Sequence, residues 1–402
     1  MKNNRIRKQV YTHIPVYSGD VSGAASALYE FGGLTVIHDP SGCNSTYNTF
    51  DELRWAKRES AIYISGLRES DAINGNDQRL LDDVVTTVDA LSEKPSFIAL
   101  CNSPVPDIIG TDFAALCRLL EKMTGIPAFY VHTNAMHDYT VGGANALEAL
   151  AEKMTAKERI DGHACAIGAA NHASHAKSVN LLGLTPFEFP YDEQADHLYD
   201  LLESAGFKVC ANWGRGTKKH PVSFKDVSHA SCADVSLVIS SIGIKAAMYL
   251  YENYGIPYVI GNPLASDDFA SVVFNDLRAS ISSQVVKNSY LSLLDDPAST
   301  AFIGESVTMG SEAAASALSG TPARLIRTTE CEVGDKPFFH GETEIAEELK
   351  KAAVIHGDPL FKNARSHGVM GFDATRQTWI DEPHLAMSGR LYFRDQKSIS
   401  VS

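Results

Sequence analysis

Apolar and polar positions along the chain follow a strand-then-helix pattern. Short apolar runs rich in β-branched residues lie at 35–38, 61–65, 97–101 and 127–132, and segments with helical periodicity lie at 22–31, 77–92, 109–123 and 143–155. Parallel strands that are buried on both faces have continuous apolar runs of this kind. The pattern therefore predicts a parallel sheet flanked by helices in the first third of the chain.

The same pattern continues to the end of the chain. A second series has strands at 178–183, 207–213, 235–241 and 257–261 and helices at 192–205, 222–230 and 243–254. A third has helices at 280–294, 310–318 and 342–353 and strands at 299–304 and 323–329, followed by a tail, 355–402, that we expect to be irregular. The alternation predicts an α/β protein with three Rossmann-like domains, whose mostly parallel sheets are flanked by helices around a central cleft.

The domain boundaries follow from breaks in this pattern. We expect domains over residues 1–155, 178–265 and 266–402, the last including the irregular tail. The segment 156–177 is rich in Ala and His and has no clear period, so it is predicted to cross between the first two domains. The chain of 402 residues is long enough for this division, because domains usually hold about 100–200 residues.

Composition and charge narrow the function classes. A net charge of −14 argues against nucleic-acid and anionic-membrane partners, which attract clustered Lys and Arg. No apolar run approaches the roughly 20 residues that span a bilayer, and the basic segment 1–15 lacks the apolar core of a signal peptide. The seven scattered cysteines predict a cytoplasmic protein whose thiols are free for metal binding or for packing.

Two cysteines follow predicted strands. The apolar run of TVIHDPSGC ends at His38, a Pro-Ser-Gly turn follows, and Cys43 lies at its tip. The segment 97–113 repeats this arrangement, with Cys101 at the strand end, a Pro-rich turn and a helix that begins near 110–112. Ligands of open α/β sheets bind beyond the carboxyl ends of the strands, so both thiols are candidates for a site. A cysteine that ends an apolar strand is also often a small core residue, and this alternative stays open for Cys101.

The ordered motifs resemble the nitrogenase component 1 superfamily. HDPSGC (38–43) is similar to its His-Gly-Pro-x-Gly-Cys turn, and PDIIGTD (106–112) is similar to its Ile-Gly-x-Asp helix start. SVNLLGLTP (178–186) resembles the beginning of the family's second domain, and GIPYVIGNPL (255–264) its Gly-Ile-Pro-Tyr strand. The resemblance covers nearly the whole chain. The superfamily includes nitrogenase catalytic subunits, cofactor-assembly scaffolds and tetrapyrrole reductases.

The resemblance implies a function and its alternatives. We expect a catalytic subunit of a nitrogenase-like two-component reductase, which receives electrons from an ATP-dependent iron protein and reduces a small molecule or tetrapyrrole. The alternative within the family is a non-catalytic scaffold for metallocofactor or tetrapyrrole assembly. An alternative outside the family is a periplasmic-type small-molecule binding protein with repeated α/β domains. The segment 65–80 lacks the Lys-Ser/Thr ending of a nucleotide-binding loop, so ATP is expected only on the iron protein.

The resemblance also implies an oxygen-sensitive iron–sulfur cluster. Family members with a full cluster carry three cysteines in the first domain, but here only Cys43 matches, with Ser18 and Pro104 at the other two positions and Asp39 in place of the motif Gly. Such a cluster usually needs four ligands. We therefore expect a [4Fe-4S] cluster shared across a two-fold interface. Each chain would supply Cys43, and also Cys101 if the longer loop turns its thiol toward the cluster. The second chain would be an identical copy or a related sister subunit.

The remaining candidates lie near the C-terminus. His384 resembles the C-terminal histidine that family members place near the substrate or cofactor cavity, where it could supply or orient a proton. Arg327 and Arg390 could bind substrate carboxylates, or could form ordinary surface ion pairs. The histidines of 163–175 fit either a metal site or a solvated linker. The other cysteines are predicted to be structural: Cys117, Cys165, Cys210, Cys232 and Cys331.

Overall fold

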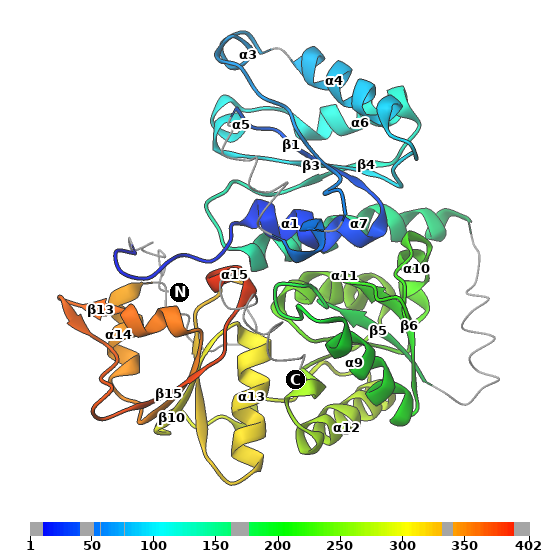
Figure 1. The fold of residues 1–402 in the computed structure, drawn as a ribbon. Coiled ribbons are helices and arrows are strands. Elements are labelled where there is room, and N and C mark those ends of the chain that lie inside the picture. Colours follow the sequence, from blue (N-terminus) through cyan, green and yellow to red (C-terminus); the bar gives the residue numbers. More distant parts are fainter. Residues whose placement is uncertain are drawn as a thin grey trace, which may run out of the picture. The chain divides into compact units, whose positions relative to one another are not determined.

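The fold is built on parallel sheets. The computed structural model of the chain describes residues 11–40, 52–56, 58–75, 77–161, 177–331 and 341–389. Their strands form sheets of four, five and four strands and one antiparallel hairpin (Figure 1). All strand pairs of the two four-stranded sheets are parallel. The prediction of an α/β fold with mostly parallel sheets flanked by helices is confirmed.

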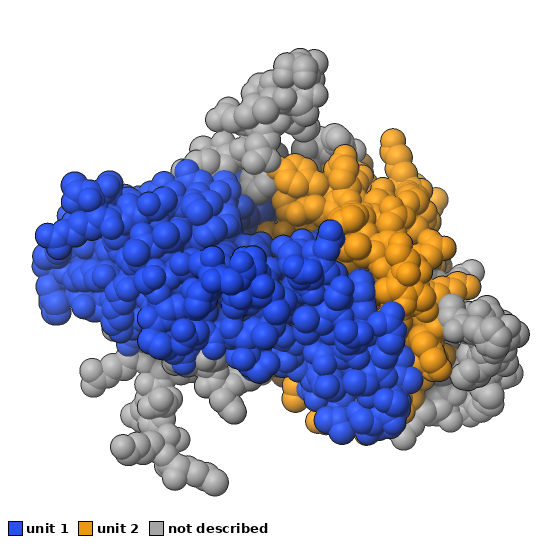
Figure 2. Space-filling model, turned by 90° about the horizontal axis from the view of Figure 1, so that it is seen from below, with its two compact units in different colours: residues 1–17, 237–241, 258–402 blue, residues 18–236, 242–257 orange. Residues whose placement is uncertain are grey.

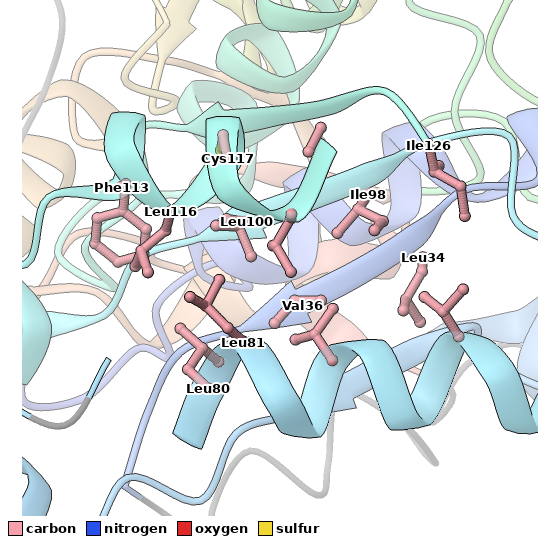
Figure 3. Close-up of a cluster of buried hydrophobic side chains, with 14 residues drawn as sticks. Leu34, Val36, Leu80, Leu81, Ile98, Leu100, Phe113, Leu116, Cys117 and Ile126 are labelled. Carbon is pink, nitrogen blue, oxygen red and sulfur yellow. The ribbon is translucent and has the colours of Figure 1, made fainter. Parts of the chain in front are cut away.

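The first sheet has helices on both faces. Its strands are β1 (Leu34–Ile37), β2 (Ile62–Ile64), β3 (Ile98–Cys101) and β4 (Ala128–Val131), in the order β2-β1-β3-β4. Helices α4 (Asp77–Ala90) and α6 (Phe113–Thr124) cover one face, and α1 (Asp20–Leu28) and α7 (Tyr139–Asp161) lie on the other (Figure 1). Apolar side chains of β1, β3, α4 and α6 form the core between them (Figure 3).

Glycines allow α1 and α7 to pack closely. A Cβ atom at Gly23 would lie 2.0 Å from the carbonyl oxygen of Tyr139, and one at Gly142 would lie 1.8 Å from the carbonyl oxygen of Asp20. Both distances are far below van der Waals contact with backbone atoms. Any larger residue at either position would push the two helices apart.

The second sheet has the order β6-β5-β7-β8-β9. Its strands are β5 (Lys177–Leu182), β6 (Phe207–Trp213), β7 (Val235–Val238), β8 (Tyr258–Ile260) and β9 (Lys287–Asn288). The helices that connect them are α9 (Asp192–Ser204), α10 (Phe224–Ser228), α11 (Ile244–Tyr254) and α12 (Asp267–Ser283).

The third sheet has the order β11-β10-β12-β15. Its strands are β10 (Thr300–Gly304), β11 (Ala323–Arg327), β12 (Val354–Gly357) and β15 (Thr378–Asp381). Helix α13 (Ser306–Leu318) packs on β10 and β11, and α14 (Glu342–Leu349) packs on the hairpin of β13 (Arg365–Ser366) and β14 (Val369–Met370). The short helix α15 (Leu385–Ser388) follows β15.

All three sheets place the first strand of their series between the second and third. In the first sheet β1 lies between β2 and β3, and in the third β10 lies between β11 and β12. The second strand is therefore added on one side of the first strand and the third on the other, so the strand order reverses there. In open α/β sheets this reversal leaves a crevice at the carboxyl ends of the strands, which is where ligands bind.

Two details of the predicted elements are wrong. The helix expected at 280–294 is α12, at 267–283, because Ser266 caps it by accepting a hydrogen bond from the Phe269 amide at 3.2 Å. The tail 355–402 is not irregular throughout, because β12 and β15 contribute two strands to the third sheet. Both strands have only four residues and mixed polarity, which gives no clear period.

The chain divides into two compact units, coloured separately in Figure 2. Unit 1 contains residues 1–17, 237–241 and 258–402, and so holds the third sheet. Unit 2 contains residues 18–236 and 242–257, and holds the first sheet. The boundaries expected near 155, 177 and 265 stay a prediction. None of the helices in the described residues is long and apolar enough to cross a membrane.

Candidate functional site

A buried histidine lies at the carboxyl edge of the first sheet. His38 directly follows β1, and its Nδ1 atom lies 2.8 Å from the hydroxyl of Ser65, which follows β2. The amide of Asp39 donates to the same hydroxyl at 3.1 Å. Burial, followed by the nearby charge of Arg79, lowers the pKa of His38 to about 4. The imidazole is therefore neutral at pH 7 and is part of a local hydrogen-bond network.

Cys101 lies inside the first sheet. It is the last residue of β3, paired with Ile37 on one side and Val131 on the other, and it is fully buried. Burial, then the charge of Asp20, raises the pKa of its thiol to about 12, and a hydrogen bond with Thr133 only partly offsets this. A protonated, enclosed thiol does not fit a cluster ligand. This environment favours the interpretation of Cys101 as a core residue.

Cys43 and its turn lie outside the described residues, as do Arg390, Cys165 and the histidines of 163–175. Within the described ranges no group of three or more His, Cys, Asp or Glu side chains could hold a metal ion. The thiols of Cys101, Cys117, Cys210 and Cys331 are free, in agreement with the sequence prediction. Cys232 is disulfide-bonded, so the expectation of free thiols is wrong for this residue.

Two short helices at this edge expose apolar side chains. Helix α3 (Glu69–Asn74) contacts α5 (Pro104–Ile109), and both lie at the same end of the sheet (Figure 1). Ile73 is 74% exposed, Ile108 is 83% exposed and Ile109 is 42% exposed. We call these three residues the isoleucine patch. Exposed apolar residues that gather on neighbouring elements are typical of protein–protein contact surfaces.

A buried carboxylate lies at the carboxyl edge of the third sheet. Glu305 follows β10, is fully buried and caps α13. It accepts hydrogen bonds from the amides of Val307 (3.0 Å) and Thr308 (2.8 Å) and from the Thr308 hydroxyl (3.0 Å). Its other oxygen accepts from the amide of Ser241 at 3.0 Å. The four hydrogen bonds balance much of the cost of burying the charge.

Arg327 lies at the same edge, at the end of β11 opposite Gly304. It is buried, so the alternative of a surface ion pair does not apply. Burial and the charge of Glu305 raise the pKa of Tyr290, and the charge of Arg327 opposes this shift. The buried hydroxyls without a hydrogen-bond partner in the described part of the chain include those of Ser241, Ser306 and Thr329.

His384 occupies the next position along this edge. It caps the N-terminus of α15, where its Nδ1 atom accepts a hydrogen bond from the amide of Ala386 at 3.2 Å. Asp358, which follows β12, accepts from the main-chain amide of His384 at 2.8 Å and from the hydroxyl of Ser388. Burial lowers the pKa of His384 to about 4. The ring is therefore neutral at pH 7.

Tyr17 contacts both His384 and the residue that follows Arg327. Its ring packs edge-on against His384, with the centroids 5.7 Å apart. Its hydroxyl lies 2.8 Å from that of Thr328, the residue after Arg327. The sequence had singled out His384 and Arg327, and the structure places both at one sheet edge.

Sequence reasoning missed three residues of the site: Tyr17, Glu305 and Asp358. A signal was available for two of them. Glu305 and Asp358 are acidic residues that directly follow apolar strands, in STAFIGE and VIHGD. Tyr17 has no such signal, because its partners are more than 300 residues away in sequence.

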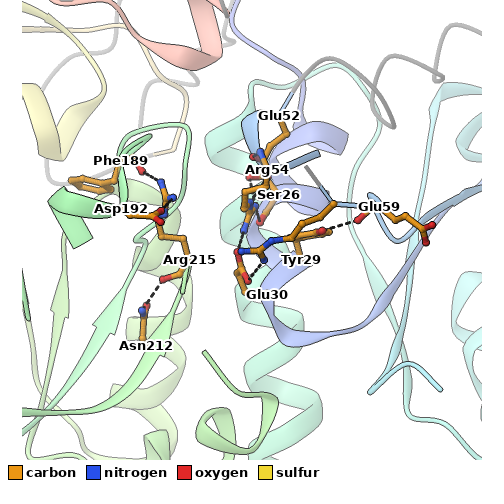
Figure 4. A network of polar contacts seen from close by, with 11 residues as sticks. Ser26, Tyr29, Glu30, Glu52, Arg54, Glu59, Phe189, Asp192, Asn212 and Arg215 are labelled. Carbon is orange, nitrogen blue, oxygen red and sulfur yellow. Dashed lines mark hydrogen bonds and ion pairs between the residues drawn. The ribbon is translucent and has the colours of Figure 1, made fainter. Parts of the chain in front are cut away.

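Figure 4 shows another buried polar network, around Arg54. The guanidinium of Arg54 contacts Glu52, Glu30 at 2.9 Å and the carbonyl oxygen of Ser26 at 2.7 Å. Every nitrogen of this guanidinium donates a hydrogen bond. Paired with two carboxylates and a main-chain carbonyl, this buried cation ties α1 to the segment around Glu52, so the network is structural.

Comparisons with known proteins agree with the fold. One component of the light-independent protochlorophyllide reductase of Prosthecochloris aestuarii is 25% identical over 273 residues, covering 67% of this chain and 46% of that protein. The equivalent protein of Chlorobium luteolum is 25% identical over 240 residues, covering 58% and 41%. The nitrogenase iron-molybdenum cofactor biosynthesis protein NifE of Klebsiella pneumoniae is 21% identical over 238 residues, covering 56% and 48%. The matched regions thus span less than half of these relatives.

A solved structure and a family profile extend the comparison. The structure of nitrogenase Cp1 at pH 6.5 superposes with a TM-score of 0.62 at 14% identity, over 98% of this chain and 94% of that one, which shows a shared fold. The profile of the nitrogenase component 1 type oxidoreductases matches residues 20–281, more than half of the 402 residues. The resemblance predicted from the motifs is confirmed. The chain belongs to the nitrogenase component 1 type oxidoreductase family.

Proposed function

We propose that the protein is a catalytic subunit of a nitrogenase-like two-component reductase. In this proposal it receives electrons from an ATP-dependent iron protein and passes them to a small molecule or tetrapyrrole bound at the third-sheet edge. The family match supports the reductase class, since two of the relatives are components of a reductase.

The polar edge of the third sheet is the observation that carries the proposal. Arg327, Glu305 and His384 are buried together at the carboxyl ends of parallel strands, with hydroxyls that have no partner in the described part of the chain. Buried polar groups normally have hydrogen-bond partners. Their gathering at a strand-order reversal supports a bound ligand there, because this is where α/β sheets bind ligands. Arg327 suits a carboxylate of such a ligand.

We propose that electrons enter the protein at the first-sheet edge. Cys43, five residues beyond His38, is proposed as a ligand of an iron–sulfur cluster shared with a second copy or a sister subunit across a two-fold interface. Two chains that each provide Cys43 leave further ligands to be supplied, since the burial of Cys101 does not suit it for this role. The isoleucine patch is proposed as part of the surface on which the iron protein docks.

The test is turnover by the complete system under anaerobic conditions. Protein purified without oxygen is mixed with an iron protein from its own source, ATP and dithionite, and candidate tetrapyrroles, thioethers and small unsaturated compounds are supplied. We expect reduction that requires both ATP and the iron protein. Absence of ATP-dependent reduction of every substrate class would contradict the reductase proposal.

A scaffold is the second candidate. The similarity to NifE, a cofactor biosynthesis protein, supports it. A scaffold would retain a metallocofactor or tetrapyrrole through purification and would show no turnover. Absorption spectra of the purified protein, measured beside the turnover assay, separate the two proposals.

A further inference from the structure

A histidine and a glutamate are hydrogen-bonded on the face of the third sheet that α13 covers. The ring of His356, in β12, stacks on Phe302 of β10, with the ring centroids 4.2 Å apart and the planes at 13°. Phe302 packs in one apolar cluster with Met309 and Ala313 of α13. The Nδ1 atom of His356 lies 2.8 Å from Oε1 of Glu382, the residue that directly follows β15. This pair therefore lies close to α13.

The other oxygen of Glu382 lacks a donor. Oε2 has almost no surface in contact with solvent and no hydrogen-bond partner within the described part of the chain. Buried polar atoms normally have such a partner, because a lost hydration shell is otherwise not replaced. Glu312, on the second turn of α13, also interacts with Glu382. Two ionised carboxylates only accept hydrogen bonds, so a proton on Glu312 would turn this contact into a hydrogen bond.

The surroundings of Glu312 favour this proton. Burial is the largest cause that raises the pKa of Glu312 well above its ordinary value, followed by the charge of Glu382 and the hydrogen bond between the two side chains. Glu382 itself can stay ionised, because His356 donates to it. Strand β11 and helix α12, which pack on α13, carry other charged residues, and none of these acts on the pKa of Glu312: Arg324, Arg327, Asp267, Asp268, Asp276 and Arg278.

We propose that Glu312 and Glu382 share one proton at pH 7 and form a pH-sensitive contact between α13 and the third sheet. Protonated Glu312 donates to Oε2 of Glu382, and His356 donates to Oε1, so the ionised carboxylate has a donor on each oxygen. The inference does not depend on the proposed function. The contact joins the helix that begins after Glu305 to the strand that leads to His384.

The contact should weaken as the pH rises. Folded protein keeps the proton of Glu312 at pH values where the unfolded chain, with an ordinary glutamate pKa of 4.5, has released it. The unfolded state then binds fewer protons than the folded state. The stabilisation is therefore complete below pH 4.5 and is lost as the pH rises through the raised pKa. Above that pKa two negative charges repel each other across the contact.

The first experiment is a pH titration of glutamate carboxyl carbons. Full-length protein labelled with 13C at the glutamate side-chain carboxyl is followed by NMR from pH 5 to pH 9, and the Glu312 signal is assigned by its absence in Glu312→Gln. In the wild type we expect this signal to stay at the protonated position at pH 6, where exposed glutamates are ionised. In Glu382→Gln the titration of Glu312 should move down towards the ordinary range, because the like charge is gone.

Urea unfolding measures the consequence for stability. The urea midpoint of the wild type should fall between pH 6 and pH 9. Glu312→Gln carries an amide that donates at any pH, so its midpoint should fall less and should exceed that of the wild type at pH 9. Glu347→Gln makes the same change at an exposed glutamate of α14 that pairs with Lys350 at 2.9 Å, and it should follow the wild type.

Two results would overturn the inference. One is a wild-type Glu312 signal that titrates together with the exposed glutamates. The other is a folded Glu312→Gln protein whose urea midpoint falls between pH 6 and pH 9 as much as that of the wild type. If Glu312→Gln does not fold, Glu312→Asp provides the assignment and the wild-type titration decides.

Discussion

The carboxyl edges of the first and third sheets have the same strand topology and different chemistry. Each has a buried histidine directly beyond the sheet, and burial lowers the pKa of both rings to about 4. His38 meets a serine hydroxyl, whereas His384 is held by a backbone amide and backed by the carboxylate of Asp358. The third-sheet edge also contains Arg327 and Glu305, whereas the first-sheet edge has the enclosed thiol of Cys101 with the isoleucine patch beside it.

The difference indicates separate tasks for one repeated topology. Buried charged and hydroxyl groups can bind and orient a small polar ligand, and these are concentrated at the third-sheet edge. Apolar side chains on adjoining short helices suit a protein partner, and these lie at the first-sheet edge. We therefore propose that substrate binds at the third-sheet edge and that electrons arrive at the first-sheet edge.

The largest expected effect comes from removing the histidine of the third edge. His384→Ala should lower kcat by about 10²–10⁴-fold, the usual contribution of a positioned proton-transfer group, and should weaken substrate binding far less. Steady-state kinetics with iron protein and ATP measure this. His38→Ala is the matched change at the first edge and should alter stability more than chemistry. A His384→Ala protein with full activity would make His384 a packing residue.

Acid should destabilise both edges. Because each folded-state pKa is near 4 and the ordinary value is near 6.5, the unfolded chain binds more protons between these values. The free energy of unfolding therefore has its full value above pH 6.5. It falls by about 3 kcal/mol for each histidine as the pH is lowered towards 4.

Urea unfolding at pH 7 and at pH 4.5 measures this loss. His38→Asn and His384→Asn should each flatten the pH dependence, and hydrogen exchange can assign the change to the first or the third sheet. Equal pH dependence in wild type and both variants would show that these histidines are not buried in the neutral form.

The isoleucine patch should give a smaller effect. Ile108→Asp places a charge at the most exposed residue of the patch and should weaken the apparent affinity for the iron protein about tenfold, equivalent to roughly 1.4 kcal/mol. Stability should change little, because the side chain contributes little to the core. Val369→Asp, at an exposed apolar residue of the β13–β14 hairpin, is the control. Equal effects of the two variants would contradict a docking role for the patch.

Much of the fold could be predicted because buried parallel strands leave continuous apolar runs. The run FKVCANW predicts the bounds of β6, and IALC lies within the predicted third strand. VIHG and TWID are too short and mixed to be distinguished from loops, so β12 and β15 were missed. Helix α12 was misplaced because its start depends on the cap of Ser266.

The candidate site was harder to predict than the fold. His384 and Arg327 could be singled out from motif and residue type, but their environment depends on tertiary structure. Asp358 acts through the backbone of His384, 26 residues away, and Tyr17 reaches Thr328 across 311 residues. The burial of Cys101, which decides its protonation, likewise follows from packing between two neighbouring strands.

In this proposal the first-sheet edge carries electrons and the third-sheet edge binds substrate. The most direct test is the iron content and low-temperature electron paramagnetic resonance of wild type, Cys43→Ala and His384→Ala after anaerobic reconstitution with iron and sulfide. We predict a reducible cluster in the wild type and in His384→Ala, and a folded but iron-free Cys43→Ala protein. A wild type that stays free of iron, or a Cys43→Ala protein that keeps the cluster, would contradict the account.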